Sequence, residues 1–116
     1  MANEPTNVII RETLGAFCGL RRLGFPNGDI HFIVSPNEHG VESLFVSLRT
    51  QGKEFNVEAG PAPDEAEFKD ALEWWGDGQD RAKYDSIWTN CVTYHHTQDL
   101  LMPMILQGFH FPATPN

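Results

Sequence analysis

The chain of 116 residues has little of two things that organise many small proteins: cysteine and positive charge. Cys18 and Cys91 are the only cysteines. Two are too few for a disulfide framework, so we expect reduced thiols, with a single disulfide between them as the alternative. Eight Lys and Arg oppose sixteen Asp and Glu, for a net charge of −8. This deficit of cations argues against direct binding to nucleic acid or to an anionic membrane surface.

Long apolar runs are absent as well. No stretch approaches the roughly 20 apolar residues that a membrane-spanning helix needs. The start of the chain has no basic segment, and its apolar stretch ends at Arg11 and Glu12, so we expect no secretory signal. No repeat, low-complexity segment or phosphate-binding glycine loop is visible. These absences predict one compact cytoplasmic domain over residues 1–116, with an irregular tail over 109–116.

Local patterns predict six elements. Apolar residues at helical spacing indicate a helix over residues 7–23, with Thr6 or Asn7 as its N-terminal cap and Gly24 as its left-handed end. Alternating patterns then predict strands over 29–35, 41–50 and 53–58. The two-residue link Gln51-Gly52 suits a tight hairpin between the last two strands. We therefore expect a three-stranded antiparallel meander.

The second half of the chain shows helical patterns. They cover residues 64–75 and 81–96, with Asp80 as a cap for the second. Pro103 interrupts the pattern that remains, so residues 99–107 form either a kinked continuation of that helix or a short separate helix. The predicted order is α-β-β-β-α-α. The fold class is α+β, with the meander packed against an N-terminal helix and C-terminal helices.

The first five of these elements resemble, in their order, the double-stranded-RNA-binding domains. In that family the second helix begins with lysines that contact RNA. Asp64, Glu65 and Glu67 stand at the corresponding place in this chain. The resemblance is therefore one of topology with the charge inverted, and RNA binding is not carried over from it.

The charge is concentrated in one window of the chain. Ten of the sixteen carboxylates lie between Glu54 and Asp85, and only Lys69, Arg81 and Lys83 oppose them, so this window holds −7 of the net −8. Charge gathered on one surface can attract and orient a partner, whereas evenly spread charge mainly aids solubility.

The second predicted helix combines this charge with two tryptophans. Trp75 falls on its core-facing stripe, and adjacent helical residues lie about 100° apart, so Trp74 lies at the edge of that stripe. Its neighbours on the same side are Glu67, Asp70 and Asp77. An indole among carboxylates is a plausible contact point, because Trp is enriched at the energetic centres of interfaces. The alternative is that Trp74 packs under the last helix and the acids only solvate the surface.

This face of Glu67, Asp70, Trp74 and Asp77 leads to the functional prediction. We expect a non-enzymatic interaction protein, an inhibitor or an adaptor, that binds a basic protein surface such as that of a nucleic-acid-binding protein. Carboxylates would steer the basic partner and speed association more than they would add affinity. No cofactor is expected.

A small enzyme or metal protein is the first alternative. Cys91 and His95 lie four residues apart in the predicted helix, so both side chains project from one face. Two ligands are fewer than a structural or a catalytic zinc site uses. The same two residues also match a nucleophile with its base, although no orienting group accompanies them.

A homodimer is the second alternative. The segment around Leu101, Met102 and Ile105 is apolar on more than one face of a short helix. One face can join the core, and the excess suggests a second contact, either with another copy of the chain or within the monomer.

Overall fold

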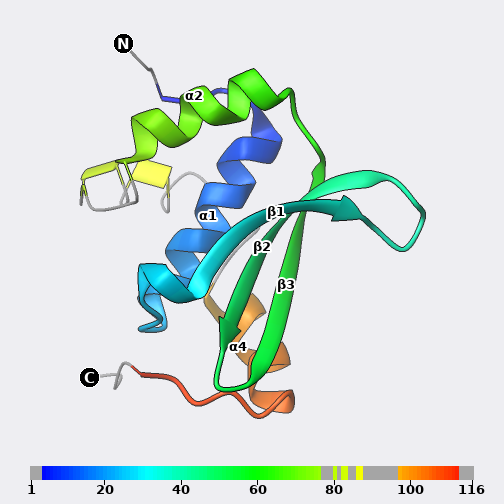
Figure 1. The fold of residues 1–116 in the computed structure, drawn as a ribbon. Helices are drawn as coiled ribbons and strands as arrows, with labels where there is room; N and C mark the ends of the chain where they lie inside the picture. Colours follow the sequence, from blue (N-terminus) through cyan, green and yellow to red (C-terminus); the bar gives the residue numbers. More distant parts are fainter. Residues whose placement is uncertain (1–3, 77–79, 81, 84–85, 88–96, 113–116) are drawn as a thin grey trace.

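The computed structural model describes residues 4–76, 80, 82–83, 86–87 and 97–112 (Figure 1). Its elements are α1 (Val8–Arg22), the 3₁₀ turn η1 (Asn27–Asp29), β1 (Ile30–Pro36), β2 (Glu42–Thr50), β3 (Lys53–Pro61), α2 (Glu65–Trp75) and α4 (Thr97–Leu106). The α+β class and the predicted order are confirmed. Residues 82–83 and 86–87 are helical, and the rest of the helix predicted over 81–96 lies outside the described residues.

Helix α1 begins and ends where its capping residues predict. The side chain of Asn7 accepts hydrogen bonds from the backbone N–H groups of Ile9 and Ile10, at 2.9 and 3.2 Å. These bonds satisfy two of the donors that a helix N-terminus leaves unpaired. At the other end, Gly24 follows the helix with φ +100°. The cap and the stop are both confirmed.

The sheet is the predicted antiparallel meander in the order β1-β2-β3. Phe32 of β1 lies opposite Val46, which in turn lies opposite Val57 of β3. Gln51 and Gly52 join β2 to β3 with φ of 57° and 71°. Two successive positive φ values give the type I′ geometry whose twist matches that of a hairpin.

Helix α1 covers one face of the sheet (Figure 1). The central strand β2 directs Leu44, Val46 and Leu48 into this contact, and all three are fully buried. Val34 on β1 shares their face and pairs with Leu44, but it lies on an edge strand and is 54% exposed. Alternation therefore predicts the face of Val34 but not its burial.

Strand β3 continues to Pro61, past the predicted end at residue 58. A register shift opposite Leu44 and Phe45 marks a bulge, and Gly60 follows it with φ +148°. A Cβ atom on Gly60 would lie 2.5 Å from Cδ1 of Ile9, so the missing side chain lets α1 approach the strand. Proline is tolerated here because β3 is an edge strand.

Helices α2 and α4 lie near opposite ends of α1 (Figure 1). Asp64 caps α2 by accepting a hydrogen bond from the N–H of Glu67 at 3.3 Å, and Gly76 ends the helix in the left-handed conformation. In α4, Pro103 lies inside the helix without ending it. The predicted stop at Gly108 is confirmed by its φ of +83°.

Candidate functional site

Helix α2 divides into a buried stripe and a charged side. Ala71 and Trp75 are buried against the core. Glu67 and Asp70 are exposed, and the spacing of about 100° per residue places them within one sector of the helix, away from Trp75. The apolar stripe thus fixes the direction in which these two carboxylates project.

A third carboxylate joins them from the N-terminal segment. Glu4, Glu67 and Asp70 edge a hollow of about 150 Å³, which Pro5, Thr6 and Ala71 complete. We call this the acidic hollow. It was not predicted, because Glu4 and Asp70 are far apart in the sequence and only the packing of α2 beside the start of α1 brings them together.

The three carboxylates of the acidic hollow differ in their hydrogen bonds and ion pairs with neighbouring side chains. Glu4 lies 3.6 Å from Nη1 of Arg11, and Glu67 accepts a hydrogen bond of 3.3 Å from Nδ2 of Asn7. Asp70 has no hydrogen bond or ion pair with any residue that the structure describes. Asp70 is therefore the carboxylate most available to a cation from outside.

Trp74 lies beside this face but is not an open contact point. Its side chain is half-buried and packs against the core, next to the ring of Trp75 at 6.2 Å between centroids. Nζ of Lys83 lies 5.1 Å from the centroid of the Trp74 ring and also donates a hydrogen bond to the Trp74 carbonyl. Trp74 is thus neither fully exposed nor fully enclosed, and its role as a contact point stays a prediction. Asp77 lies outside the described residues.

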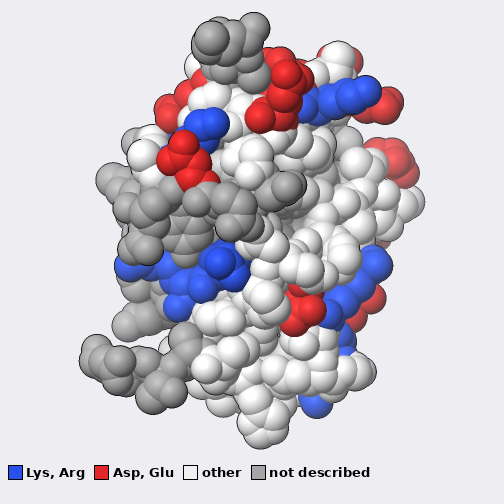
Figure 2. All heavy atoms as spheres, turned by 60° about the vertical axis from the view of Figure 1, so that its left-hand side comes forward, with Lys and Arg blue, Asp and Glu red and all other residues white. Residues whose placement is uncertain are grey.

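The acidic window does not form one surface. Glu54 and Glu58 belong to β3, where Glu54 lies 3.7 Å from Nε of Arg49 and Glu58 accepts a hydrogen bond from Asn37. Figure 2 shows acidic side chains around the top of the molecule, where α2 lies in Figure 1, with cations both among them and in a separate patch lower down. The field near α2 therefore comes from a local group of carboxylates.

Two carboxyl groups elsewhere have shifted pKa values with opposite causes. Burial raises the pKa of Glu12 on α1, against the lowering effect of Arg11. Hydrogen bonds from Asn37 and Ser43 lower the pKa of Glu58. A raised carboxyl pKa opposes folding once the group ionises, whereas a lowered one adds stability that is lost in acid.

The alternative based on Cys91 and His95 falls outside the described residues. Among the residues that the structure does describe, no three His, Cys, Asp or Glu side chains are placed to hold a metal ion. Cys18 is a fully buried residue of α1.

Helix α4 has a buried face and an apolar outer face. Leu100 and Met104 are buried, and Leu101 is half-buried against the core. Met102 and Ile105 are exposed as the dimer alternative requires. Leu106, which was not among the predicted contacts, is the most exposed of them at 81%.

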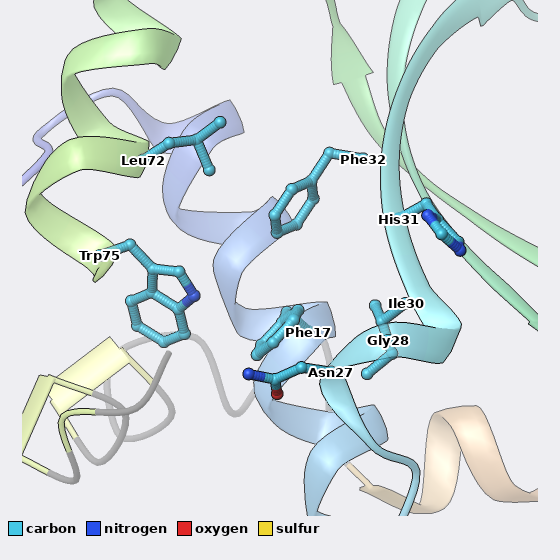
Figure 3. Close-up of a pocket in the computed structure, with 8 residues that line it drawn as sticks. All are labelled: Phe17, Asn27, Gly28, Ile30, His31, Phe32, Leu72 and Trp75. Atoms are coloured by element: carbon cyan, nitrogen blue, oxygen red, sulfur yellow. The ribbon is translucent and has the colours of Figure 1, made fainter. Parts of the chain in front are cut away.

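A pocket that the sequence pattern did not reveal opens between α1, η1, β1 and α2. Its volume is about 550 Å³, within the range of small-molecule sites. Its walls include Phe17, Ile30, Phe32, Leu72 and Trp75, drawn in Figure 3. We call this the aromatic pocket. Because its walls come from separate elements, no local motif indicates it.

The indole of Trp75 brings a buried polar group to the aromatic pocket. This side chain is 1% exposed, yet its Nε1 has no hydrogen-bond partner among the residues that the structure describes. Leaving a buried donor unpaired costs about 1–3 kcal/mol. Figure 3 shows the nitrogen directed toward the space between Trp75, Phe17 and Phe32.

Comparison with known proteins gives no further information. No protein-family model matches the chain, and no curated protein or solved structure matches it either. None of the described helices has both the length and the apolar character that crossing a membrane requires.

Proposed function

We propose that the protein is a non-enzymatic interaction protein, an inhibitor or an adaptor, whose α2 helix binds a basic surface on another protein. The observation that supports this proposal is the acidic hollow, where Glu4, Glu67 and Asp70 converge from two segments of the chain. A hollow of this size can receive the end of one Lys or Arg side chain. The exposed carboxylates around it favour a cation over any anionic ligand.

The partner's cation would pair first with Asp70, which has no ion pair with a described residue. Glu67 is held by Asn7 and Glu4 by Arg11, so both are already oriented at the edge of the hollow. Oriented carboxylates lose less conformational entropy on binding than mobile ones. Exposed ion pairs contribute only about 0–1 kcal/mol each, so the main effect of the charge is on specificity and association rate.

A nucleic-acid-binding protein is the class of partner that fits this chemistry. The cationic groups of such a protein are spaced to contact phosphates. The carboxylates on the α2 surface can take the positions that those phosphates would occupy. Binding of this kind would block the partner's nucleic-acid site. Trp74 would contribute its exposed edge, with Lys83 lying over the ring.

The test is affinity chromatography of an extract from the source cells on the immobilised protein at low salt, followed by a salt gradient. We expect a basic protein to be retained and to elute at moderate salt. A second column carries the variant Glu67→Gln/Asp70→Asn, and the same protein should pass through it. Retention that does not respond to salt would contradict the proposal.

A matched control distinguishes binding at the acidic hollow from binding by the total negative charge of the protein. The variant Glu65→Gln/Glu73→Gln removes two exposed carboxylates of the same helix that do not line the acidic hollow, and it has the same net charge as the first variant. We expect it to retain the partner nearly as well as the unmodified protein. If both variants lose the partner equally, the total charge binds it and the acidic hollow has no special role.

A further inference from the structure

We propose that the aromatic pocket binds a small, uncharged, mainly aromatic molecule that accepts a hydrogen bond from Nε1 of Trp75. This site is separate from the acidic hollow and does not depend on the proposed function. Two observations carry it: a cavity of about 550 Å³ and a buried N–H without a described partner that is directed into it.

The walls select a flat apolar molecule. Phe17 packs edge-on against Trp75 with 5.7 Å between ring centroids, and Phe17 and Phe32 are also 5.7 Å apart. Phe32 is only partly buried, and the open part of its ring offers stacking or edge-to-face contacts to an aromatic guest. Ile30 and Leu72 add aliphatic surface on either side.

The indole nitrogen selects a hydrogen-bond acceptor. Indole N–H is a donor only, so a carbonyl oxygen or an unprotonated ring nitrogen can satisfy it, whereas a second donor cannot. An apolar guest without an acceptor would leave the N–H unpaired. In sites built this way, the polar group orients the ligand while the apolar walls supply most of the buried area.

The surroundings favour an uncharged guest. No Lys or Arg is among the lining residues, and the chain is strongly acidic, so an anion would have no counter-charge in the pocket. A cation would face the positive end of the N–H dipole. Gly28 and His31 are exposed on the η1–β1 side, where a guest can enter.

The experiment uses two probes of the same shape. Acetophenone carries a carbonyl, and α-methylstyrene has a methylene group in place of that oxygen. The indole N–H signals of the whole protein are followed in ¹H–¹⁵N spectra during titration with each probe, and the signal missing from Trp75→Phe identifies Trp75. We expect acetophenone to move the Trp75 signal downfield and to bind roughly three- to tenfold more tightly than α-methylstyrene.

Variants test whether Trp75 causes the preference for acetophenone and whether both probes bind in the aromatic pocket. In Trp75→Phe the preference for acetophenone should disappear, because the donor is gone while the aromatic wall remains. Trp74→Phe removes the neighbouring indole, which does not line the pocket, and should leave both affinities unchanged. Gly28→Leu adds a side chain at the rim, where a Cβ meets nothing within 4 Å, and should weaken both probes together.

Two results would overturn the proposal. One is an unmoved Trp75 signal up to the solubility limit of acetophenone. The other is equal binding of the two probes to the unmodified protein, which would show that the N–H does not select the guest. Both results come from the unmodified protein, so they hold even where a variant fails to fold.

Discussion

Helices α2 and α4 each attach one stripe to the core but present different chemistry outward. The buried stripe of α2 ends in Trp75, and its outer side carries Glu67 and Asp70. The buried stripe of α4 consists of Leu100 and Met104, and its outer side carries Met102 and other apolar residues. Two helices that each bury one stripe thus leave one charged surface and one apolar surface near opposite ends of the molecule.

The difference shows which interaction each helix can serve. Contacts through exposed carboxylates weaken as salt rises, because counterions screen them. Contacts through apolar side chains do not depend on that screening, and some salts strengthen them. Ionic strength therefore separates binding of a basic partner at α2 from self-association at α4.

The largest effect is expected on the buried stripe of α2. Trp75→Ala should lower the free energy of unfolding by about 3–5 kcal/mol, because it removes a large, fully enclosed ring and leaves a cavity. Urea unfolding followed by circular dichroism measures the change. Glu73→Ala on the exposed side should alter stability by no more than about 0.5 kcal/mol. Similar losses for both would mean that α2 does not pack as described.

The corresponding contrast in α4 uses two methionines. Met104→Ala should cost about 2–5 kcal/mol, because Met104 is fully buried. Met102 is 58% exposed, and Met102→Ala should stay within about 0.5 kcal/mol. Thermal or urea unfolding of the two variants checks the assignment of faces. A reversed order would place the wrong side of α4 against α1.

Substitution of the glycine that follows each helix should lower the stability of the protein by a similar amount. Gly76 after α2 and Gly108 after α4 have φ of 57° and 83°, a region that costs other residues about 1–2 kcal/mol. Gly76→Ala and Gly108→Ala should each lose about that amount in urea unfolding. An added Cβ meets nothing within 4 Å at Gly76 and makes only an ordinary contact with Lys53 at Gly108. A much larger loss at either position would indicate a clash that these distances do not show.

The homodimer alternative predicts an effect confined to the outer face of α4. Light scattering at several concentrations should then show a mass that rises with concentration, and Ile105→Lys should return the protein to the monomer mass. The charge change Glu73→Lys on α2 serves as the control and should leave the mass unchanged. A mass independent of concentration in the unmodified protein would rule out this contact.

The smallest effect concerns a carboxylate far from both helices. Nδ2 of Asn37 donates a hydrogen bond of 3.0 Å to Glu58 and is the main cause of its lowered pKa. Because the folded-state pKa is lowered, this contribution to stability is present above the ordinary pKa and is lost as the pH falls through the lowered value. In Asn37→Ala the pKa of Glu58 should rise toward its ordinary value, as measured by NMR titration of the carboxyl carbon.

The control for this titration is another asparagine on the same sheet. Nδ2 of Asn56 donates to Glu54 rather than to Glu58. Asn56→Ala should therefore leave the titration of Glu58 unchanged. If both variants shift the Glu58 titration equally, a general change of the sheet causes it rather than the Asn37 hydrogen bond.

Much of the fold was predictable because its signals are local. The Asn7 cap, the stop at Gly24 and the Gln51-Gly52 turn each depend on residues a few positions apart. Alternation along β2 likewise places Leu44 and Leu48 on one face of the strand, and both are buried. The bulge near Gly60 was missed because it is defined by the pairing of β3 with Leu44 and Phe45 of β2, which no local pattern indicates.

The candidate sites likewise have a part that local spacing predicts and a part that depends on distant segments of the chain. Helical spacing grouped Glu67 with Asp70 on one side of α2, and both residues are exposed. It gave no sign that Glu4 would complete the acidic hollow or that Lys83 would lie over Trp74. These neighbours come from distant positions in the chain, where spacing carries no information.

By itself, the amino-acid order determined the elements, their caps, their hairpin turn and which helical side is apolar, because each follows from interactions within a few residues. Only the tertiary structure decided which sides meet. The packing of α1, η1, β1 and α2 created the aromatic pocket and left the N–H of Trp75 without a described partner, since a cavity exists only between surfaces that distant segments bring together.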